Sequence, residues 1–311
     1  MPIIDLATIS STATLGQHIG AAARGIGFFV LTNHSVSRDL IADVFAESHR
    51  FFALERSAKE ALSIKHSPHN RGYVGLMEEQ LDPTKPGDVK EGFNLGLNLP
   101  VNDPEVLAGR PFRGVNVWPS SADCPTFRET MLEYFSACHA LGRTLHRAIA
   151  LDLGLDESFF EDKLDRPLAT LRLLHYPPRP ASYAPGQSGA GVHTDYGNLT
   201  LLATDDARGL EVQTRDAEWI TAPTIEGALI VNVGDCLMRW TNDVYVSTPH
   251  RVVNPIGRER FSVAFFLDAN PEARVEALPS CVSAMRPARY PPIQCADYIA
   301  ERLNATYAHR R

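Results

Sequence analysis

The sequence predicts a mainly β protein, with a sandwich or barrel in its second half and flanking α-helices that come mostly from its first half. Two observations predict this class. From about residue 168 onward, short apolar segments recur at near-regular spacing with turn residues between them. Many short strands spaced in this way are typical of sandwiches and barrels. Before that point, apolar residues recur at helical spacing instead.

The first part of the chain is expected to form helices around a buried strand. Ser37 has the residue type that caps a helix, and Pro125 suits the first turn of another helix. Residues 64–121 are rich in Pro, Gly, Asn and Asp, so this long stretch is expected to carry function or short strands of its own. The expected elements are a strand–helix–strand unit within residues 1–34 (helix 14–24, strand 28–31), helices over 37–54, 57–63 and 125–153, and a brief helix over 156–162.

The second part of the chain is expected to form the β-sheets, followed by a helical tail over residues 292–308. Turn signals such as Gly197-Asn198 and Gly234-Asp235 separate the apolar segments. Because we expect the opening strands to join the same barrel, residues 1–311 are predicted to form a single domain with a helix-rich part (1–165), a β core (166–290) and a C-terminal helix (291–311). The expected strands are 170–176, 192–195, 199–204, 210–213, 219–222, 228–233, 236–240, 251–254 and 261–268.

Composition limits the possible partners. The 311 residues are 44% hydrophobic and 22% charged, with a net charge of −7 and no basic run. Nucleic acid and anionic membrane surfaces are therefore not expected partners, and no obligate protein partner is evident. The five cysteines are scattered, and the N-terminus lacks the features of a signal peptide. With no apolar run of membrane-spanning length, these features predict a reduced, cytoplasmic protein.

A possible metal site is the strongest chemical signal. His193 and Asp195 are two residues apart, so on a β-strand both side chains would point to the same face. His250 could supply a third ligand from a neighbouring strand. Two histidines and one carboxylate on one side of a metal form the facial arrangement of non-haem Fe(II) oxygenases. An isolated His-x-Asp pair is common by chance, so this pattern alone is only a hypothesis.

A second signal lies ten residues after His250. Arg260 and Ser262 are again two apart, in a run rich in β-branched and aromatic residues. They would share one strand face with Ala264 and Phe266. A buried arginine is costly unless it is paired, so it is either part of a structural ion pair or a planar fork that binds a carboxylate.

With these residues, the chain resembles the iron(II)/2-oxoglutarate-dependent dioxygenases, in the branch that contains isopenicillin N synthase, the plant flavonoid and gibberellin oxidases and the bacterial ethylene-forming enzyme. The family pattern is His-x-Asp, a distant His, and Arg-x-Ser about ten residues later. Further family segments occur in the expected order: Pro2-Ile3-Ile4-Asp5-Leu6, Gly27-Phe28-Phe29-Val30-Leu31-Thr32-Asn33-His34 (followed by Ser35 where relatives usually have Gly), Trp118-Pro119, Tyr176-Pro177 and Gly209-Leu210-Glu211-Val212.

The resemblance implies a double-stranded β-helix (jelly roll) and a defined set of cofactors. His193, Asp195 and His250 would bind Fe(II), which also takes 2-oxoglutarate and O2. Arg260, Ser262 and Tyr176 would contact 2-oxoglutarate. Turnover would couple oxidative decarboxylation of 2-oxoglutarate to succinate and CO2 with hydroxylation, desaturation or cyclisation of a small-molecule substrate. An Asp at position 195 argues against the halogenase variant of the family.

Residues near the substrate opening are also suggested by the resemblance. Tyr73, Glu78 and Phe93 lie in segments that relatives place there, and they are our candidates for substrate contact. We expect Glu78 and Glu79 to lie in a solvated loop, as surface acids usually do. The alternative is that they recognise a cationic substrate.

Three other functions remain open at this point. A zinc hydrolase would use the same ligand types, but the chain has no His-Glu-x-x-His motif and Arg260 would have no role. A 2-oxoglutarate-independent oxidase of the same fold would use Arg260 and Ser262 to hold its own substrate. A non-catalytic binding protein on this scaffold would be expected to have lost at least one metal ligand. The identity of the primary substrate, the oligomeric state and the pathway do not follow from the sequence.

Overall fold

The computed structural model describes residues 1–82, 84–178 and 187–306. The strands are β1 Ile3–Asp5, β2 Phe28–Thr32, β3 Gly72–Val74, β4 Glu91–Gly96, β5 Thr170–Tyr176, β6 Ala190–His193, β7 Leu199–Thr204, β8 Leu210–Gln213, β9 Trp219–Thr221, β10 Leu229–Val233, β11 His250–Val252, β12 Arg260–Leu267, β13 Arg274–Val275 and β14 Ile293–Gln294. The helices are α1 Thr12–Gly25, α2 Arg38–Phe52, α3 Arg56–Glu60, α4 Pro104–Leu107, α5 Phe127–Asp152, α6 Asp235–Trp240 and α7 Cys295–Thr306.

Two sheets organise the chain. The larger sheet has eight strands in the order β1-β2-β10-β7-β12-β5-β4-β3, and the smaller has four in the order β6-β11-β8-β9. Neighbouring strands in both sheets are antiparallel except for β1 and β2. The opening strands thus join the sheet that carries β12, as expected. Because the first half contributes helices α1 to α5, the whole chain is a mixed α/β structure built on antiparallel sheets.

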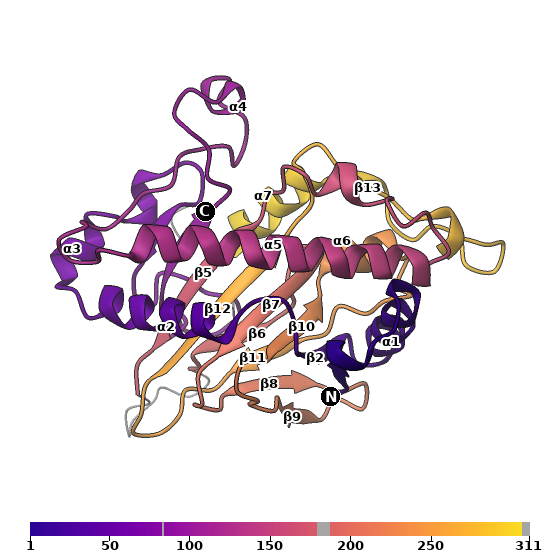
Figure 1. Cartoon of the computed structure of the whole chain (residues 1–311), viewed down its shortest axis with the longest axis horizontal. Coiled ribbons are helices and arrows are strands. Elements are labelled where there is room, and N and C mark those ends of the chain that lie inside the picture. Colours follow the sequence, from indigo (N-terminus) through magenta and orange to yellow (C-terminus); the bar gives the residue numbers. More distant parts are fainter. Residues whose placement is uncertain (83, 179–186, 307–311) are drawn as a thin grey trace.

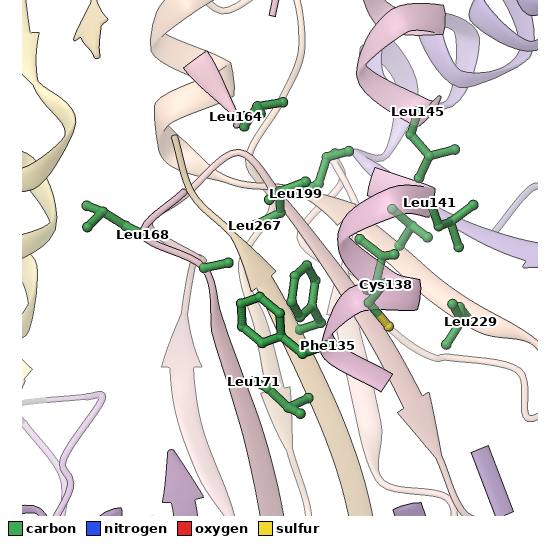
Figure 2. Close-up of a cluster of buried hydrophobic side chains, with 14 of the residues drawn as sticks. Phe135, Cys138, Leu141, Leu145, Leu164, Leu168, Leu171, Leu199, Leu229 and Leu267 are labelled. Atoms are coloured by element: carbon green, nitrogen blue, oxygen red, sulfur yellow. The ribbon is translucent and has the colours of Figure 1, made fainter. Parts of the chain in front are cut away.

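A layer of helices covers one face of the larger sheet (Figure 1). The long helix α5 lies across this sheet and presents an apolar stripe to it that includes Phe135, Cys138 and Leu141. Figure 2 shows these side chains packed against Leu199 of β7 and Leu267 of β12. A large apolar core between helices and sheet therefore fixes the outer side of β7 and β12 and leaves their other face available.

The two sheets pack against each other on that other face. A second, smaller core contains Phe28 and Val30 from β2 and Tyr176 from β5, packed with Val212 from β8 and Val252 from β11. Alternate residues of one strand therefore serve different layers, as the two-residue period of a strand requires. On β12, Phe261, Val263 and Phe265 belong to the helix-side core.

Most of the predicted elements are confirmed. Helix α2 begins after Ser37, whose hydroxyl accepts a hydrogen bond from the Leu40 amide. Three predicted strands have the predicted bounds, β5, β7 and β8. The N-cap of α5 is Thr126, so Pro125 lies just before the helix and not in its first turn. The brief helix expected over 156–162 is reduced to a 3-10 turn at Glu161–Lys163. The helical tail is α7, and the end of its predicted range, 307–308, lies outside the described residues.

One predicted strand is wrong. Residues 236–240 form helix α6 instead of a strand. The amides of Asp235 and Cys236 in its first turn donate to the backbone carbonyls of Asp195 and Gly197, at 2.8 and 2.9 Å. A short apolar run fits a buried strand and a buried helix equally well. Here the carbonyls of a loop that is distant in sequence satisfy the helix N-terminus.

Candidate metal centre

Three side chains converge at one end of the smaller sheet. Strand β6 ends at His193, and Asp195 follows two residues beyond the end of the strand. Asp195 is therefore not on the same strand as His193, although the sequence pattern predicted that it would be. His250 opens the adjacent strand β11, directly opposite His193 in the register. Strand pairing therefore brings the two histidines together, and the turn after β6 adds the carboxylate.

The geometry of these three groups suits a cation. Nε2 of His193 and Nε2 of His250 lie 3.8 and 3.5 Å from Oδ1 of Asp195. Among the described residues, these three are the group of possible ligands that come close enough together to hold a metal. Nδ1 of His193 lies 2.7 Å from the Gly191 carbonyl and Nδ1 of His250 lies 3.1 Å from the Thr248 carbonyl. With Nδ1–H donating to a carbonyl, Nε2 carries the lone pair that a metal needs.

The carboxylate of Asp195 is held from behind. Its Oδ2 accepts hydrogen bonds from Thr200 Oγ1 at 2.5 Å and Asn232 Nδ2 at 2.7 Å. Thr200 lies on β7 and Asn232 on β10, so the larger sheet orients a ligand that extends from the smaller one. Hydrogen bonds of this kind fix the direction of a ligand and leave the other oxygen, Oδ1, facing the histidines.

Charge and burial keep Asp195 and His193 in the protonation states that bind metals. Burial alone raises the pKa of Asp195, but the neighbouring His250 and His193 outweigh it and hold the pKa well below its usual range. Burial, with a further contribution from His250, lowers the pKa of His193 to about 3. Burial also acts on His250, but the Asp195 carboxylate outweighs it and raises its pKa. At neutral pH Asp195 is thus ionised and His193 is neutral, the forms that bind metals.

A buried guanidinium lines the same cavity. Arg260 is 1% exposed, and its Nη1 donates to Ser262 Oγ at 3.2 Å. Its Cζ lies 4.8 Å from the ring centroid of Tyr176, which is the residue opposite it on β5. No carboxylate of the described residues lies within ion-pair distance of Arg260, and its Nε has no hydrogen-bond partner there. Asp205 is near enough for an electrostatic interaction with Arg260 but forms no ion pair with it. A buried cation without an anion in direct contact is costly, so the site fits an anionic ligand.

The metal ligands and these residues share one cavity between the sheets. His193, Asp195, His250, Arg260, Ser262 and Tyr176 all line it. The predicted face of β12 is confirmed, because Ala264 and Phe266 line the cavity as well. The donor set, two imidazole nitrogens and one carboxylate, fits Fe(II), and the unpaired Arg260 fits the far carboxylate of 2-oxoglutarate.

The three candidate substrate residues are not on this cavity. Tyr73 and Phe93 face the helix layer, where both pack against Phe51 of α2. Phe93 is on the wrong face of β4 because the strand alternates, and its neighbour Asn94 lines the cavity instead. Glu78 forms an ion pair with Lys65 at 2.5 Å and remains partly exposed.

Glu79 corrects the expectation of a solvated loop. It is 3% exposed, lines the cavity, and receives both terminal nitrogens of Arg172 at 2.9 Å. Lys90 lies 2.8 Å from the same carboxylate and 2.7 Å from Asp88. Burial alone raises the pKa of Glu79, but the two cations outweigh it and hold it well below its usual range. Glu79, Arg172 and Lys90 line the cavity and form a buried charged network with Asp88 behind them, which the sequence pattern did not predict.

One signal for the missed residues was available. Arg172 and Leu174 precede Tyr176 at two-residue steps on β5, so a strand that turns Tyr176 toward the cavity turns Arg172 toward it as well. Asn70, Thr200 and Asn232 gave no comparable signal, because their position depends on contacts between strands that are distant in sequence.

Comparison with known proteins agrees with this geometry. Residues 1–121 match the family described as "non-haem dioxygenase in morphine synthesis N-terminal", and residues 167–269 match the 2OG-Fe(II) oxygenase superfamily. The chain is 36% identical over 314 residues to the 2-oxoglutarate-Fe(II) type oxidoreductase hxnY of Emericella nidulans, covering 98% of this chain and 90% of that protein. It is 39% identical over 266 residues to the 2-oxoglutarate-dependent dioxygenase citB of Monascus ruber, covering 84% and 80%.

Solved structures show the same similarity. A full-length Neurospora crassa protein in complex with alpha-KG superposes with a TM-score of 0.86 at 34% identity, covering 98% of this chain and 96% of that one. JOX2 in complex with 2OG, Fe and JA superposes with a TM-score of 0.80 at 30% identity, covering 96% and 83%.

The chain belongs to the iron(II)/2-oxoglutarate-dependent oxygenase superfamily. It is an oxidoreductase whose cofactors are Fe(II) and 2-oxoglutarate. The family predicted from the sequence is therefore confirmed. Within residues 1–82, 84–178 and 187–306, no helix combines the length and the apolar character that crossing a bilayer requires.

Proposed function

We propose that His193, Asp195 and His250 bind the Fe(II) and that Arg260, Ser262 and Tyr176 bind 2-oxoglutarate. The observation that supports this best is the shared cavity, which is lined both by three convergent metal-binding side chains and by a buried guanidinium that forms no ion pair. When bound, iron and 2-oxoglutarate supply the oxidising chemistry, which consumes O2 and yields succinate and CO2. The protein supplies the positions of the reacting groups and excludes bulk water.

Each side chain has a distinct part in this proposal. His193 and His250 are fixed by their Nδ1 contacts, so their Nε2 atoms are presented without reorganisation. Arg260 offers its guanidinium to the far carboxylate, and Ser262 adds a hydroxyl donor. The Tyr176 ring lies against the guanidinium and limits the directions from which the carboxylate reaches it. The 2-oxoglutarate molecule is thus oriented from both ends.

The core is proposed to be a double-stranded β-helix. Four strands of the larger sheet, β10-β7-β12-β5, face the four strands β6-β11-β8-β9 of the smaller sheet, with the metal-binding residues in the cavity between them. Strands β1 to β4 extend the larger sheet on both sides. Because these strands come from the helix-rich part, we propose that residues 1–311 form one domain.

The primary substrate is proposed to be a small molecule. Solved relatives contain small molecules in their complexes: the Neurospora crassa protein with thymine or with 5-formyluracil, and JOX2 with JA. In this chain the cavity is lined by aromatic and aliphatic side chains together with many polar and charged groups, including Asn70, Asn94 and Arg172. Such a mixture is typical of small-ligand sites.

Iron binding by variants tests the assignment of the metal ligands. We expect His193→Ala, Asp195→Ala and His250→Ala to lose Fe(II) in anaerobic equilibrium dialysis followed by metal analysis. His18→Ala, which changes an exposed histidine of α1, should bind iron as the unmodified protein does. Full iron binding by any of the three variants, with the fold intact by circular dichroism, would remove that residue from the site.

A further inference from the structure

One carboxylate in the cavity has no partner. Asp268 follows β12 and continues the face that begins with Arg260 and passes through Phe266. It lines the cavity and is 7% exposed. Among the described residues it forms no hydrogen bond and no ion pair, whereas two other cavity carboxylates are well satisfied. Glu79 contacts two cations, and Asp195 accepts bonds from two side-chain donors.

A buried carboxylate without a hydrogen-bond donor lowers the stability of the folded protein. A buried ionised group without a donor carries most of its desolvation penalty. A side chain that served only the fold would be expected to have acquired a donor or to be an apolar residue of similar size. The cavity therefore holds an acceptor that is available to a ligand.

Aromatic side chains accompany Asp268 in the cavity. One side of the carboxylate is closed, because Oδ1 lies against Gly197 in the turn that follows Asp195, where a Cβ atom would come within 1.5 Å of it. Tyr196 precedes that glycine, and Phe266 precedes Asp268 by two residues on the same face. Both aromatic residues line the cavity. The acceptor is therefore accompanied by rings on which a flat or cationic group packs favourably.

We propose that Asp268 accepts a hydrogen bond from an N–H group of the primary substrate, so that the enzyme acts on a nitrogen-bearing small molecule. The inference rests on the proposed function, because it takes this cavity as the site of substrate oxidation. The N–H group belongs either to a neutral ring amide or to an ammonium group. An acceptor that is satisfied only by the right substrate gives selectivity, because a compound without the donor leaves the carboxylate buried and unpaired.

Matched probes test this inference. Thymine is compared with 1,3-dimethylthymine, and benzylamine with toluene, so that in each pair one compound has N–H donors and the other has no donor. Stimulation of succinate release is measured for each compound with the iron-loaded enzyme. We expect at least one N–H probe to stimulate about tenfold or more over its partner, since one unmade hydrogen bond to a buried charged group is worth about one to two factors of ten.

Variants then assign the effect to Asp268. Asp268→Ala should abolish the preference within the responding pair. Asp268→Asn should largely retain a preference for thymine and lose one for benzylamine, which distinguishes the neutral donor from the cation. Asp216→Asn, at an exposed turn, is the control for the change of charge. Without any ligand, Asp268→Asn should raise the melting temperature, because an unpaired carboxylate is removed.

The outcomes separate this inference from the proposed function. If iron and 2-oxoglutarate bind but neither N–H probe is preferred, or if Asp268→Ala keeps the preference, the role of Asp268 is wrong. A melting temperature lowered by Asp268→Asn would also contradict it, because it would mean that the carboxylate supports the fold. If the unmodified protein fails to bind iron or 2-oxoglutarate, the proposed function itself fails.

Discussion

Replacing Arg260 tests the cosubstrate site most sharply. The guanidinium is 1% exposed and forms no ion pair among the described residues, so 2-oxoglutarate would be the anion in direct contact with it. Truncating one member of a buried, hydrogen-bonded charge pair costs about 2–5 kcal/mol. Taking about 3 kcal/mol for Arg260→Leu predicts that the KM for 2-oxoglutarate rises about 150-fold. Ser262→Ala removes a single neutral donor, which is worth about 1 kcal/mol, so its KM should rise only about fivefold.

The stability of the ligand-free protein provides the complementary readout. Because Arg260 has no ion pair to lose, Arg260→Leu should leave the melting temperature of the ligand-free protein unchanged or raise it, while the stabilisation by 2-oxoglutarate disappears. Arg258→Leu is the matched control, since Arg258 is exposed and pairs with Asp206 at the surface. Succinate release at varied 2-oxoglutarate gives the KM values. An unchanged KM for Arg260→Leu would refute the assignment, and Arg260 would then be a candidate for binding the primary substrate.

Three further predictions follow from the geometry. Asn232→Ala removes a donor to Asp195 and should weaken Fe(II) binding about 10- to 100-fold in anaerobic dialysis; unchanged affinity would show that the contact is dispensable. Burial lowers the pKa of His146 to about 4. The unfolded chain binds a proton on this imidazole near the usual pKa of 6.5, whereas the folded protein binds it only near pH 4. His146 should therefore make the free energy of unfolding about 2 kcal/mol lower at pH 5 than at pH 7, as measured by urea unfolding. His146→Gln should lack this part of the decrease. Glu79→Gln removes the negative charge that pairs with Arg172 and Lys90 and should cost about 3 kcal/mol of unfolding free energy; an unchanged urea midpoint would contradict this.

Strand periodicity made much of the site predictable. The two-residue period placed Arg260 and Ser262 on one strand face, and the family resemblance added Tyr176; all three line the cavity. Strand periodicity does not apply to Asp195, because this residue lies beyond the end of β6. Its carboxylate nevertheless faces the histidines. There the hydrogen bonds from two strands of the other sheet decide the orientation, and local sequence does not encode them.

The substrate side was poorly predicted for the same physical reason. Phe93 and Asn94 are adjacent in β4 and face opposite layers, and family resemblance alone did not specify which of them faces the cavity. Glu79 looked like a loop residue because surface acids are common, whereas its burial depends on Arg172 and Lys90 from distant segments. Helix α6 was assigned as a strand because the carbonyls that satisfy its first turn come from the loop around Asp195. Contacts that are distant in sequence explain all three differences.

The central claim is that one cavity binds Fe(II) and 2-oxoglutarate together through the named residues. Anaerobic titration of the metal-free protein with Fe(II) and then with 2-oxoglutarate, followed by visible absorption, tests it most directly. We expect a weak charge-transfer band when 2-oxoglutarate is added to the unmodified protein. The band should be absent in Asp195→Ala and should require far more 2-oxoglutarate in Arg260→Leu. A protein that binds iron but shows no band at saturating 2-oxoglutarate, or an Asp195→Ala variant that shows a full band, would contradict the claim.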